Sequence, residues 1–337
     1  MRDVAARAGV SVATVSRTLA GSAVVAPEAR ERVLTAVADL GYVASRLPAN
    51  MRARNLRILA LVVGNVRNAY FPELIDGCVE AAQRAGFPLI FGDSNEDPER
   101  ESDILGQLAS ERVSGVALAT SIGTTLGLRR LLDLRIPVVA VDRRLHGMPV
   151  DTVTVEGVGG VQSAIEHLIG LGHRRIGLVI GPLSLSTMAD RAQGYRQGLA
   201  QGGIAFDPEL VAQVDLQEAT AQRVVGDLMR LADPPTAVIG CNDLTTIGAM
   251  RGLRELGLRV PEDVSLIGFD DVIGGDLMDP PLTVIQQPVF EIGCRAVDVL
   301  IARIDDPMAP RIDVALPTRL VVRASTASPA SHARGEV

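Results

Sequence analysis

Two short helical patterns meet at Gly9 within residues 3–19, and their spacing could place one helix in a groove of DNA. The apolar positions expected to pack the two helices together are Val4, Ala5, Ala8, Val12, Val15 and Leu19. Gly9 permits the positive φ of a tight turn because it has no Cβ, and Ser11 can cap the second helix with its hydroxyl. A helix-turn-helix of this kind inserts the N-terminal residues of its second helix into the major groove. The sequence therefore predicts a DNA-reading head, with a two-helix packing motif of no function as the alternative.

Charge is distributed unevenly along the chain. The first 57 residues carry nine arginines against four acids, a local charge of +5, whereas the whole chain has a net charge of −7. The remaining residues therefore carry −12. A basic head on an acidic body suits a protein that presents only its head to the phosphates of DNA.

A third helix is expected over residues 28–40, where apolar residues recur on one face and Gly41 follows as a C-terminal cap. Residues 42–57 are polar and basic with little core character, which is typical of a linker.

From Arg57 onward, short β-branched segments alternate with amphipathic helical segments. Nearly continuous apolar strands that alternate with helices are typical of parallel sheets covered on both faces. The number of units favours two similar α/β lobes, and ligands of such sheets bind at the carboxyl ends of the strands, here in a cleft between the lobes. Strands are expected at 58–63, 88–91, 115–119, 137–141, 175–180, 236–240 and 264–268, and helices near 70–86, 97–111, 125–134, 157–171, 186–202, 217–231, 243–256 and 289–304.

The composition limits the classes of protein that remain. A chain of 337 residues is long enough for two or three domains. Its three cysteines, Cys78, Cys241 and Cys294, lack the spacing of a metal site and are expected to be buried reduced thiols. No apolar signal core begins the chain, and the longest apolar runs are too short to span a bilayer. We expect a cytoplasmic protein with no metal, cofactor or membrane partner.

The ordered motifs of this chain resemble those of the LacI/GalR family of transcriptional regulators. The resemblance runs from Met1 to about Ser325, and its landmarks are residues 3–5, 8–11, 14–17, 30–33, 40–42, 61–63, 166–168, 171–176, 242–243, 260–265 and 268–271. It implies an N-terminal all-α helix-turn-helix DNA-binding domain and an α/β periplasmic-binding-protein-like core of two doubly wound parallel-sheet lobes. It also implies a homodimer that binds a palindromic double-stranded DNA operator as a repressor and binds a small effector between the lobes.

The resemblance divides the chain into a head, a hinge, two lobes and a tail. The core lobes are each built from two stretches of sequence, because the chain returns to the first lobe near its end. The expected boundaries are 1–44 for the DNA-binding domain, 45–56 for the hinge helix and linker, 57–156 with 288–317 for the N-lobe, 157–287 with 318–325 for the C-lobe, and 326–337 for a disordered tail.

Carried over position by position, the family's base-reading residues fall on Val12, Ala13 and Arg17. Arginine can donate two hydrogen bonds to O6 and N7 of guanine, whereas the two apolar side chains can contact thymine methyl groups. The alternative for Arg17 is a contact to phosphate alone. The remaining polar positions are interpreted as phosphate-binding or capping groups, and they are Ser11, Thr14 and Ser16.

The family's hinge helix falls on residues 45–53, with its minor-groove wedge on Met51 and the adjacent basic residue on Arg52. Methionine replaces the more usual leucine but remains an apolar side chain that can open a base step. Pro48 is a sharper departure. It fits the first turn of a helix capped by Ser45, where a missing N–H is tolerated, and would shorten a helix that begins later.

The family's effector-contacting positions fall in both lobes. An arginine, an asparagine and an aspartate that converge in a cleft supply donors and acceptors suited to vicinal hydroxyls. The alternative is that Arg191 and Asp270 form a structural ion pair. The mapped positions are Tyr70 and Phe71 in the first lobe and Thr187, Arg191, Asn242 and Asp270 in the second.

Two departures from the family bear on the effector. Purine-binding members have an arginine where this chain has Leu185, and many sugar-binding members stack an aromatic ring where it has Leu216. Tyr70 and Phe71 are then the evident stacking groups. A sugar or related polyol is the expected effector.

Two other classes of protein share parts of these patterns. An extracytoplasmic sugar-binding protein has the same core fold, but it has no use for a helix-turn-helix. A nucleotide-dependent enzyme is suggested by residues 156–160, Glu-Gly-Val-Gly-Gly, but the third glycine of a dinucleotide fingerprint is missing from its register. We therefore expect a regulator that is not an enzyme. Whether it represses or activates depends on where its operator lies.

Overall fold

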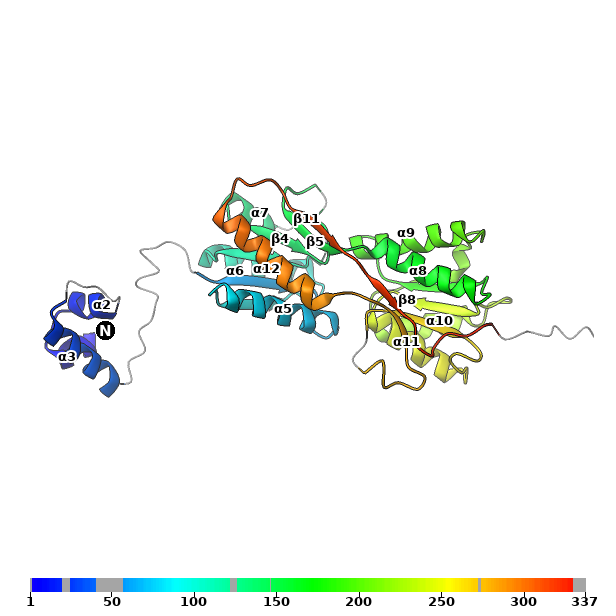
Figure 1. The fold of residues 1–337 in the computed structure, drawn as a ribbon, viewed down its shortest axis with the longest axis horizontal. Coiled ribbons are helices and arrows are strands. Elements are labelled where there is room, and N and C mark those ends of the chain that lie inside the picture. The colour runs from blue at the N-terminus through cyan, green and yellow to red at the C-terminus, as the bar shows by residue number, and fades with distance from the viewer. Residues whose placement is uncertain are drawn as a thin grey trace, which may run out of the picture. The chain divides into compact units, whose positions relative to one another are not determined.

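The computed structural model describes residues 2–19, 25–40, 57–121, 126–145, 147–271 and 274–329. The chain divides into two compact units, Met1–Leu56 and Arg57–Val337 (Figure 1). The expected hinge helix, with Pro48, Met51 and Arg52, lies outside the described residues, as does the expected cap Gly41.

Three helices form the N-terminal unit, and they are α1 (Arg2–Ala8), α2 (Val12–Leu19) and α3 (Pro27–Asp39). Gly9 joins the first two with a φ of 62°, as its lack of a side chain predicts. The N–H of Thr14 donates to Ser11 Oγ at 3.1 Å, so Ser11 caps α2. The core of this unit consists of Val4, Ala5, Ala8, Val15, Val33 and Ala36. The predicted helix-turn-helix is confirmed.

Val12 does not pack between the first two helices, and that expectation is wrong. Its side chain is 44% exposed, whereas Val15 is fully buried. Because a helix turns by about 100° per residue, Val12 lies about 60° around α2 from Val15. It is also the first residue of the helix, beyond the packed stripe. An apolar side chain is thereby left on the outer surface of α2.

The core unit begins with a six-stranded sheet in the order β11–β5–β4–β3–β1–β2, in which all neighbouring strands are parallel. Helices α5 (Tyr70–Arg84) and α12 (Val289–Asp305) cover one face, and α6 (Pro98–Glu111) and α7 (Leu126–Asp133) cover the other. The strands are β1 (Leu59–Val63), β2 (Leu89–Asp93), β3 (Gly115–Leu118), β4 (Val138–Val141), β5 (Asp151–Val155) and β11 (Asp313–Leu316).

A second six-stranded sheet has the order β12–β10–β9–β8–β6–β7. Its neighbours are parallel except for β10 and β12, which run antiparallel. Helices α8 (Gly157–Gly170) and α9 (Ser186–Gln201) cover one face, and α10 (Glu218–Leu228) and α11 (Asp243–Glu255) cover the other. The strands are β6 (Ile176–Ile180), β7 (Val211–Gln213), β8 (Ala237–Gly240), β9 (Ser265–Phe269), β10 (Thr283–Gln286) and β12 (Arg319–Val321), and a 3-10 turn, η1 (Pro208–Leu210), precedes β7.

The two sheets have the same strand order. Strands β1 to β5 of the first sheet correspond in turn to β6 to β10 of the second, and β11 corresponds to β12. We call the two halves the N-lobe and the C-lobe. The chain passes between them after β5, after β10 and after β11. The predicted fold class of two doubly wound lobes is confirmed. The sequence patterns missed five of the strands, which are β5, β7, β10, β11 and β12.

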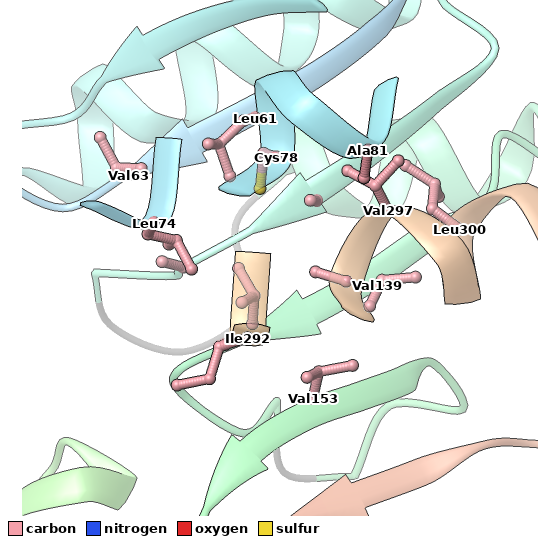
Figure 2. Close-up of a cluster of buried hydrophobic side chains, with 14 of the residues drawn as sticks. Leu61, Val63, Leu74, Cys78, Ala81, Val139, Val153, Ile292, Val297 and Leu300 are labelled. Carbon is pink, nitrogen blue, oxygen red and sulfur yellow. The ribbon is translucent and has the colours of Figure 1, made fainter. Parts of the chain in front are cut away.

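Helices α5 and α12 cross closely over the N-lobe sheet, and Figure 2 shows the apolar side chains that they bury. The crossing depends on two glycines. A Cβ on Gly77 would lie 2.1 Å from the carbonyl oxygen of Phe290, and one on Gly293 would lie 2.3 Å from that of Leu74. The thiol of Cys78 donates to Gly293 O at 3.3 Å. This contact joins the middle of α5 to α12.

The expected start of the disordered tail at residue 326 is too early. Thr326 Oγ1 lies 2.9 Å from His167 Nε2, and the N–H of Ala327 donates to Ser265 Oγ at 3.0 Å. Ala327 O also lies 2.9 Å from His173 Nε2. These hydrogen bonds hold the segment after β12 against the C-lobe. Residues 330–337 lie outside the described part of the chain.

Two further features of the described residues bear on earlier expectations. The three cysteines are free, and Cys78 and Cys241 are buried as expected, whereas Cys294 is partly exposed. Among the described helices, none combines the length and apolar composition needed to cross a membrane.

Candidate functional site

A cavity lies between the two lobes, at the carboxyl ends of their parallel strands. Side chains from the start of α5 and from the loops after β2 and β4 line it on the N-lobe side, and side chains from α9 and the loops after β7, β8, β9 and β10 line it on the C-lobe side. All six positions predicted to contact an effector line this one cavity, namely Tyr70, Phe71, Thr187, Arg191, Asn242 and Asp270.

The aromatic pair of the N-lobe wall is held by the start of α5. The N–H of Tyr70 donates to Asn68 Oδ1 at 2.8 Å, and the ring of Tyr70 meets that of Phe71 edge to face with centroids 5.3 Å apart. Both side chains are buried. Burial raises the pKa of the Tyr70 phenol well above its usual value, and the nearby carboxylates of Asp142 and Asp270 raise it further. The phenol is therefore a neutral hydroxyl at the cavity.

Asp142 and Arg143, which also line the cavity, follow strand β4 and belong to a largely buried charge network. Arg143 Nη1 and Nη2 each lie 2.7 Å from an oxygen of Glu96, and Nη1 also donates to Thr120 O at 2.9 Å. The Asp142 carboxylate lies 3.5 Å from Arg143 Nε. Burial raises the pKa of Asp142, and the charge of Arg143 opposes that rise. The family motifs did not point to these residues, although Asp142 directly follows a predicted strand on the ligand-binding edge of a sheet.

Arg191 projects from α9 into the C-lobe wall. Its guanidinium stacks over the ring of Phe269 at 3.6 Å from the centroid, and Nη1 donates to Cys241 O. Among the described residues, Arg191 forms no ion pair with Asp270, although its charge lowers the pKa of that carboxyl. The alternative of a structural Arg191–Asp270 pair is therefore not what the structure contains.

Asn242 is the N-terminal cap of α11 as well as a cavity residue. Its Oδ1 accepts the N–H of Thr245 at 2.8 Å, and its own N–H donates to Thr245 Oγ1 at 2.9 Å. The side-chain oxygen is thus already engaged. Asn242 can offer a ligand the two N–H donors of its amide.

Asp270 directly follows β9 and has a φ of 74°, a conformation that ends the extended strand. Its N–H donates to Ile285 O at 3.0 Å, and Gln287 Nε2 donates to its Oδ1. Burial raises the pKa of Asp270 to about 7, although the charge of Arg191 opposes the rise. Gln287 also lines the cavity, and neither this residue nor strand β10, which it follows, was predicted from the sequence.

Three buried polar atoms at the cavity have neither a hydrogen-bond partner nor an ion-pair partner within the described part of the chain. They are the hydroxyl of Tyr70, Nε of Arg191 and Oε1 of Gln287. Buried polar groups in native proteins are nearly always paired, and an unpaired one costs about 1–3 kcal/mol. Their convergence on one cavity points to a bound partner that supplies both donors and acceptors.

Cross-lobe contacts flank the cavity on two sides. Arg144 of the N-lobe forms two hydrogen bonds with the carboxylate of Asp190 on α9, and its N–H donates to Ser186 Oγ at 2.9 Å. On the other side, the N–H of Ala69 donates to Asp243 Oδ2 at 2.9 Å. These contacts bridge the lobes directly.

The predicted DNA-reading positions share the outer surface of α2. Val12, Ala13, Ser16 and Arg17 are exposed. Ser11 and Thr14 are joined by a hydrogen bond between their hydroxyls at 2.9 Å. The exposed face therefore combines one guanidinium with two small apolar side chains, the combination that the major groove can accept.

Comparison with known proteins agrees with this combination of units. Residues 1–45 match the profile of "Bacterial regulatory proteins, lacI family", and residues 165–326 match that of a "Periplasmic binding protein-like domain". A helix-turn-helix head on a periplasmic-binding-protein-like core defines a class of transcriptional regulators. The repressor PurR of Haemophilus influenzae strain PittEE is 31% identical over 332 residues, which are 97% of this chain and 98% of PurR. The protein belongs to the LacI family.

Two solved structures extend the likeness to the fold. The transcriptional regulator CelR in complex with cellobiose is 31% identical and superposes with a TM-score of 0.75, covering 96% of this chain and 98% of CelR. The Lac repressor dimer bound to its operator and the anti-inducer ONPF is 26% identical and superposes with a TM-score of 0.82, again over 96% of this chain and 98% of the other.

Proposed function

We propose that this protein is a homodimeric repressor that binds a palindromic operator and responds to a small sugar or polyol between its lobes. The observation that carries the proposal is the convergence of the six mapped effector positions and three unpartnered buried polar atoms on one interlobe cavity. CelR, which resembles this chain over nearly its whole length, was solved with a sugar. The regulator would act in the cytoplasm, where its DNA lies.

The chemistry of the cavity suits hydroxyl groups. A hydroxyl donates one hydrogen bond and accepts others. It can therefore accept from Arg191 Nε or the Asn242 amide and donate to the carboxylate of Asp270. Tyr70 and Phe71 add apolar ring surface against which the C–H face of a sugar can pack. Leu185 and Leu216 are buried apolar residues, which supply no donor for a purine ring.

Lobe movement would couple the effector to DNA binding. The cavity volume is about 70 Å³, far below the roughly 300 Å³ of a small ligand site. An effector therefore requires the lobes to separate and then close on it. A ligand that contacts both lobes stabilises the arrangement in which its contacts are complete, and it shifts the population accordingly. In the proposed dimer, that shift would reach the operator through the hinge residues Met51 and Arg52.

DNA recognition is assigned to the exposed face of α2. We infer that Arg17 reads guanine, that Val12 and Ala13 contact thymine methyls, and that the hydroxyls nearby contact phosphate. The phosphate contacts would give steep salt dependence. The proposed phosphate-contacting or capping positions are Ser11, Thr14 and Ser16.

A selection experiment followed by titration tests the proposal. Operators are selected from random DNA with the full-length protein, and a palindrome of roughly 14–20 base pairs is expected from two half-sites one helical turn apart. Operator affinity is then measured by fluorescence anisotropy with D-ribose, D-cellobiose, xylitol and adenosine. A sugar or polyol should change the affinity of the wild type, and Asp270→Ala should lose that response.

Two outcomes contradict the proposal in different ways. Failure to select any palindrome would refute the dimeric DNA-reading assignment. A response to adenosine with none to the sugars and polyols would refute the carbohydrate assignment and leave the regulator assignment standing. The control variant Asp305→Asn changes an exposed acid of the N-lobe outside the cavity and should keep the wild-type response.

A further inference from the structure

Two aspartates that follow β9 are adjacent in sequence but have different surroundings. Of the two, only Asp270 lines the interlobe cavity. The carboxylate of Asp271 is instead held by Arg323, whose Nη1 lies 2.8 Å from Oδ1 and whose Nη2 lies 2.6 Å from Oδ2. Both side chains of this pair are largely buried. A two-point contact of this geometry restricts the orientation of both groups.

Arg323 belongs to the segment that follows β12, and hydrogen bonds fasten this segment to β9 and β10. The N–H of Arg323 donates to Thr283 Oγ1 at 2.9 Å, and its Nη1 donates to Leu282 O at 2.9 Å. Two residues further on, Ser325 Oγ accepts the N–H of Thr283 at 2.8 Å and donates to Leu266 O at 2.6 Å. The guanidinium is therefore fixed to the framework of the C-lobe sheet.

The backbone of Asp270 has a conformation that needs restraint. Its φ of 74° lies in the left-handed region, which is unfavourable for a residue with a Cβ and persists where surrounding contacts hold it. On the N-terminal side, its N–H donates to Ile285 O at 3.0 Å. On the C-terminal side, the next residue is Asp271, which the ion pair with Arg323 holds. The direction of the Asp270 side chain is thus restrained from both sides.

The N-lobe contains the same arrangement with the charges exchanged. Asp142 lines the cavity with a φ of 65°, and its N–H donates to Val153 O at 3.0 Å. The next residue, Arg143, forms a two-point ion pair with Glu96, in which Nη1 and Nη2 each lie 2.7 Å from an oxygen. In each lobe, a left-handed aspartate at the cavity is therefore followed by a residue held in a two-point ion pair. This recurrence favours a role for the pair in positioning the aspartate.

We propose that Arg323 is a positioning residue for effector binding, which acts through Asp271 to hold the Asp270 side chain at the cavity. Arg323 does not line the cavity itself, and the family resemblance assigned it no role. The inference rests on the proposed function, because it takes Asp270 to be an effector-binding residue. It applies to Asp270 in either protonation state, because the contacts that restrain this residue involve its backbone and its neighbour.

Hydrogen exchange tests the positioning without a ligand. Exchange of the Asp270 amide is followed by mass spectrometry of overlapping peptides from the full-length protein. In Arg323→Ala this amide should exchange about 10-fold faster or more than in the wild type, because its neighbour is released. Arg303→Ala is the matched control. It removes a two-point pair with Asp151 in the N-lobe, in which both distances are 2.8 Å, and it should leave the exchange of Asp270 unchanged.

Calorimetric titration tests the consequence for binding. The probes are D-ribose, D-cellobiose, xylitol and adenosine. A probe that binds the wild type should bind Arg323→Ala at least about 10-fold more weakly, similar to the loss found when groups that orient metal ligands are removed. Arg323→Lys keeps the charge but not the planar two-point contact, so its loss should be smaller, and it serves as the test if Arg323→Ala does not fold. Arg303→Ala should bind as the wild type does.

A double-mutant cycle tests whether the effect passes through Asp271. Asp271→Ala should weaken binding as much as Arg323→Ala does. The double variant should bind no more weakly than either single variant, because the two side chains act as one unit. Additive losses would overturn the assignment of Asp271 as the link between Arg323 and Asp270.

The remaining outcomes separate this inference from the proposed function. Unchanged exchange of Asp270 in Arg323→Ala would overturn the positioning role. Equal affinity of Arg323→Ala and the wild type for a bound probe would also overturn it and leave the proposed function in place. An equal loss of affinity in Arg303→Ala would show a general effect of lowered stability and overturn it as well. If no probe binds the wild type, the carbohydrate effector is refuted, and the exchange of Asp270 by itself supports or overturns the positioning.

Discussion

Arg144 and Asp190 form a two-point ion pair between the lobes, with Arg144 Nη1 2.8 Å from Oδ2 and Nη2 2.6 Å from Oδ1. Arg144 follows strand β4 in the N-lobe, and Asp190 lies near the start of α9 in the C-lobe. Planar guanidinium–carboxylate pairs of this geometry are among the stronger hydrogen-bonded contacts of proteins. The pair can form only when the two lobes are close, so it favours the closed arrangement.

Removal of this ion pair should weaken effector binding. Arg144→Ala and Asp190→Ala should each lower effector affinity several-fold, and a double-mutant cycle should give a coupling free energy of about 1 kcal/mol. The effector affinities, and from them the coupling free energy, are measured by calorimetric titration with the sugar that binds the wild type. Arg259→Ala removes a similar pair, with Asp263, that lies within the C-lobe, and it should not change the affinity. A coupling of zero would show that the pair does not stabilise the closed lobes.

The crossing of α5 and α12 should tolerate no side chain at Gly77. Gly77→Ala places a methyl group 2.1 Å from Phe290 O, so the helices must move apart, and overpacking of this kind costs about 1–3 kcal/mol of unfolding free energy. Gly106→Ala is the matched control, because it also lies inside a helix but its Cβ would meet nothing within 4 Å. That variant should be stabilised by about 0.5–1 kcal/mol. Chemical denaturation measures both, and equal stabilities would contradict the close crossing.

Asp270 should make the protein less stable as the pH rises from about 4 to 7. Its pKa is about 7 in the folded protein and about 3.9 in an unfolded chain, so the folded state holds the proton more tightly. The stability that this proton contributes is fully present below the unfolded pKa and is lost as the pH rises through the folded one. Asp270→Asn should therefore show a smaller decrease in melting temperature across this range than the wild type. Parallel melting curves of the two proteins would refute the raised pKa.

Arg17 should discriminate between operator sequences. Arg17→Ala should relax the preference for guanine at one position in each half-site by about 1–3 kcal/mol, because a two-point hydrogen bond to O6 and N7 is lost. The loss of preference is measured by anisotropy titrations of Arg17→Ala and the wild type against operators substituted at single positions. Equal weakening on all sequences would instead assign Arg17 to a phosphate contact.

The sequence alone determined the order of units and most of the elements. Buried strands such as β1 and β6 are continuous apolar runs, and helices such as α5 have a marked apolar face, so their patterns are visible without a partner. The strands that were missed are short, polar or half exposed. Strand β5 reads Asp-Thr-Val-Thr-Val, and β11 alternates exposed with partly buried residues, so each acquires its identity from pairing with a neighbour that lies far away in sequence.

The tertiary structure decided how the side chains of the site are used. The motifs indicated Arg191, Asn242 and Asp270, but folding determined that Arg191 bonds to Cys241 O, that Asn242 caps a helix, and that Asp270 meets Gln287. Asp142 directly follows a predicted strand, but the fold decided that it lines the same cavity as Asp270. The physical reason is that hydrogen bonding and burial act between groups brought together by the fold, whereas periodicity and local motifs record only what lies within a few residues along the chain.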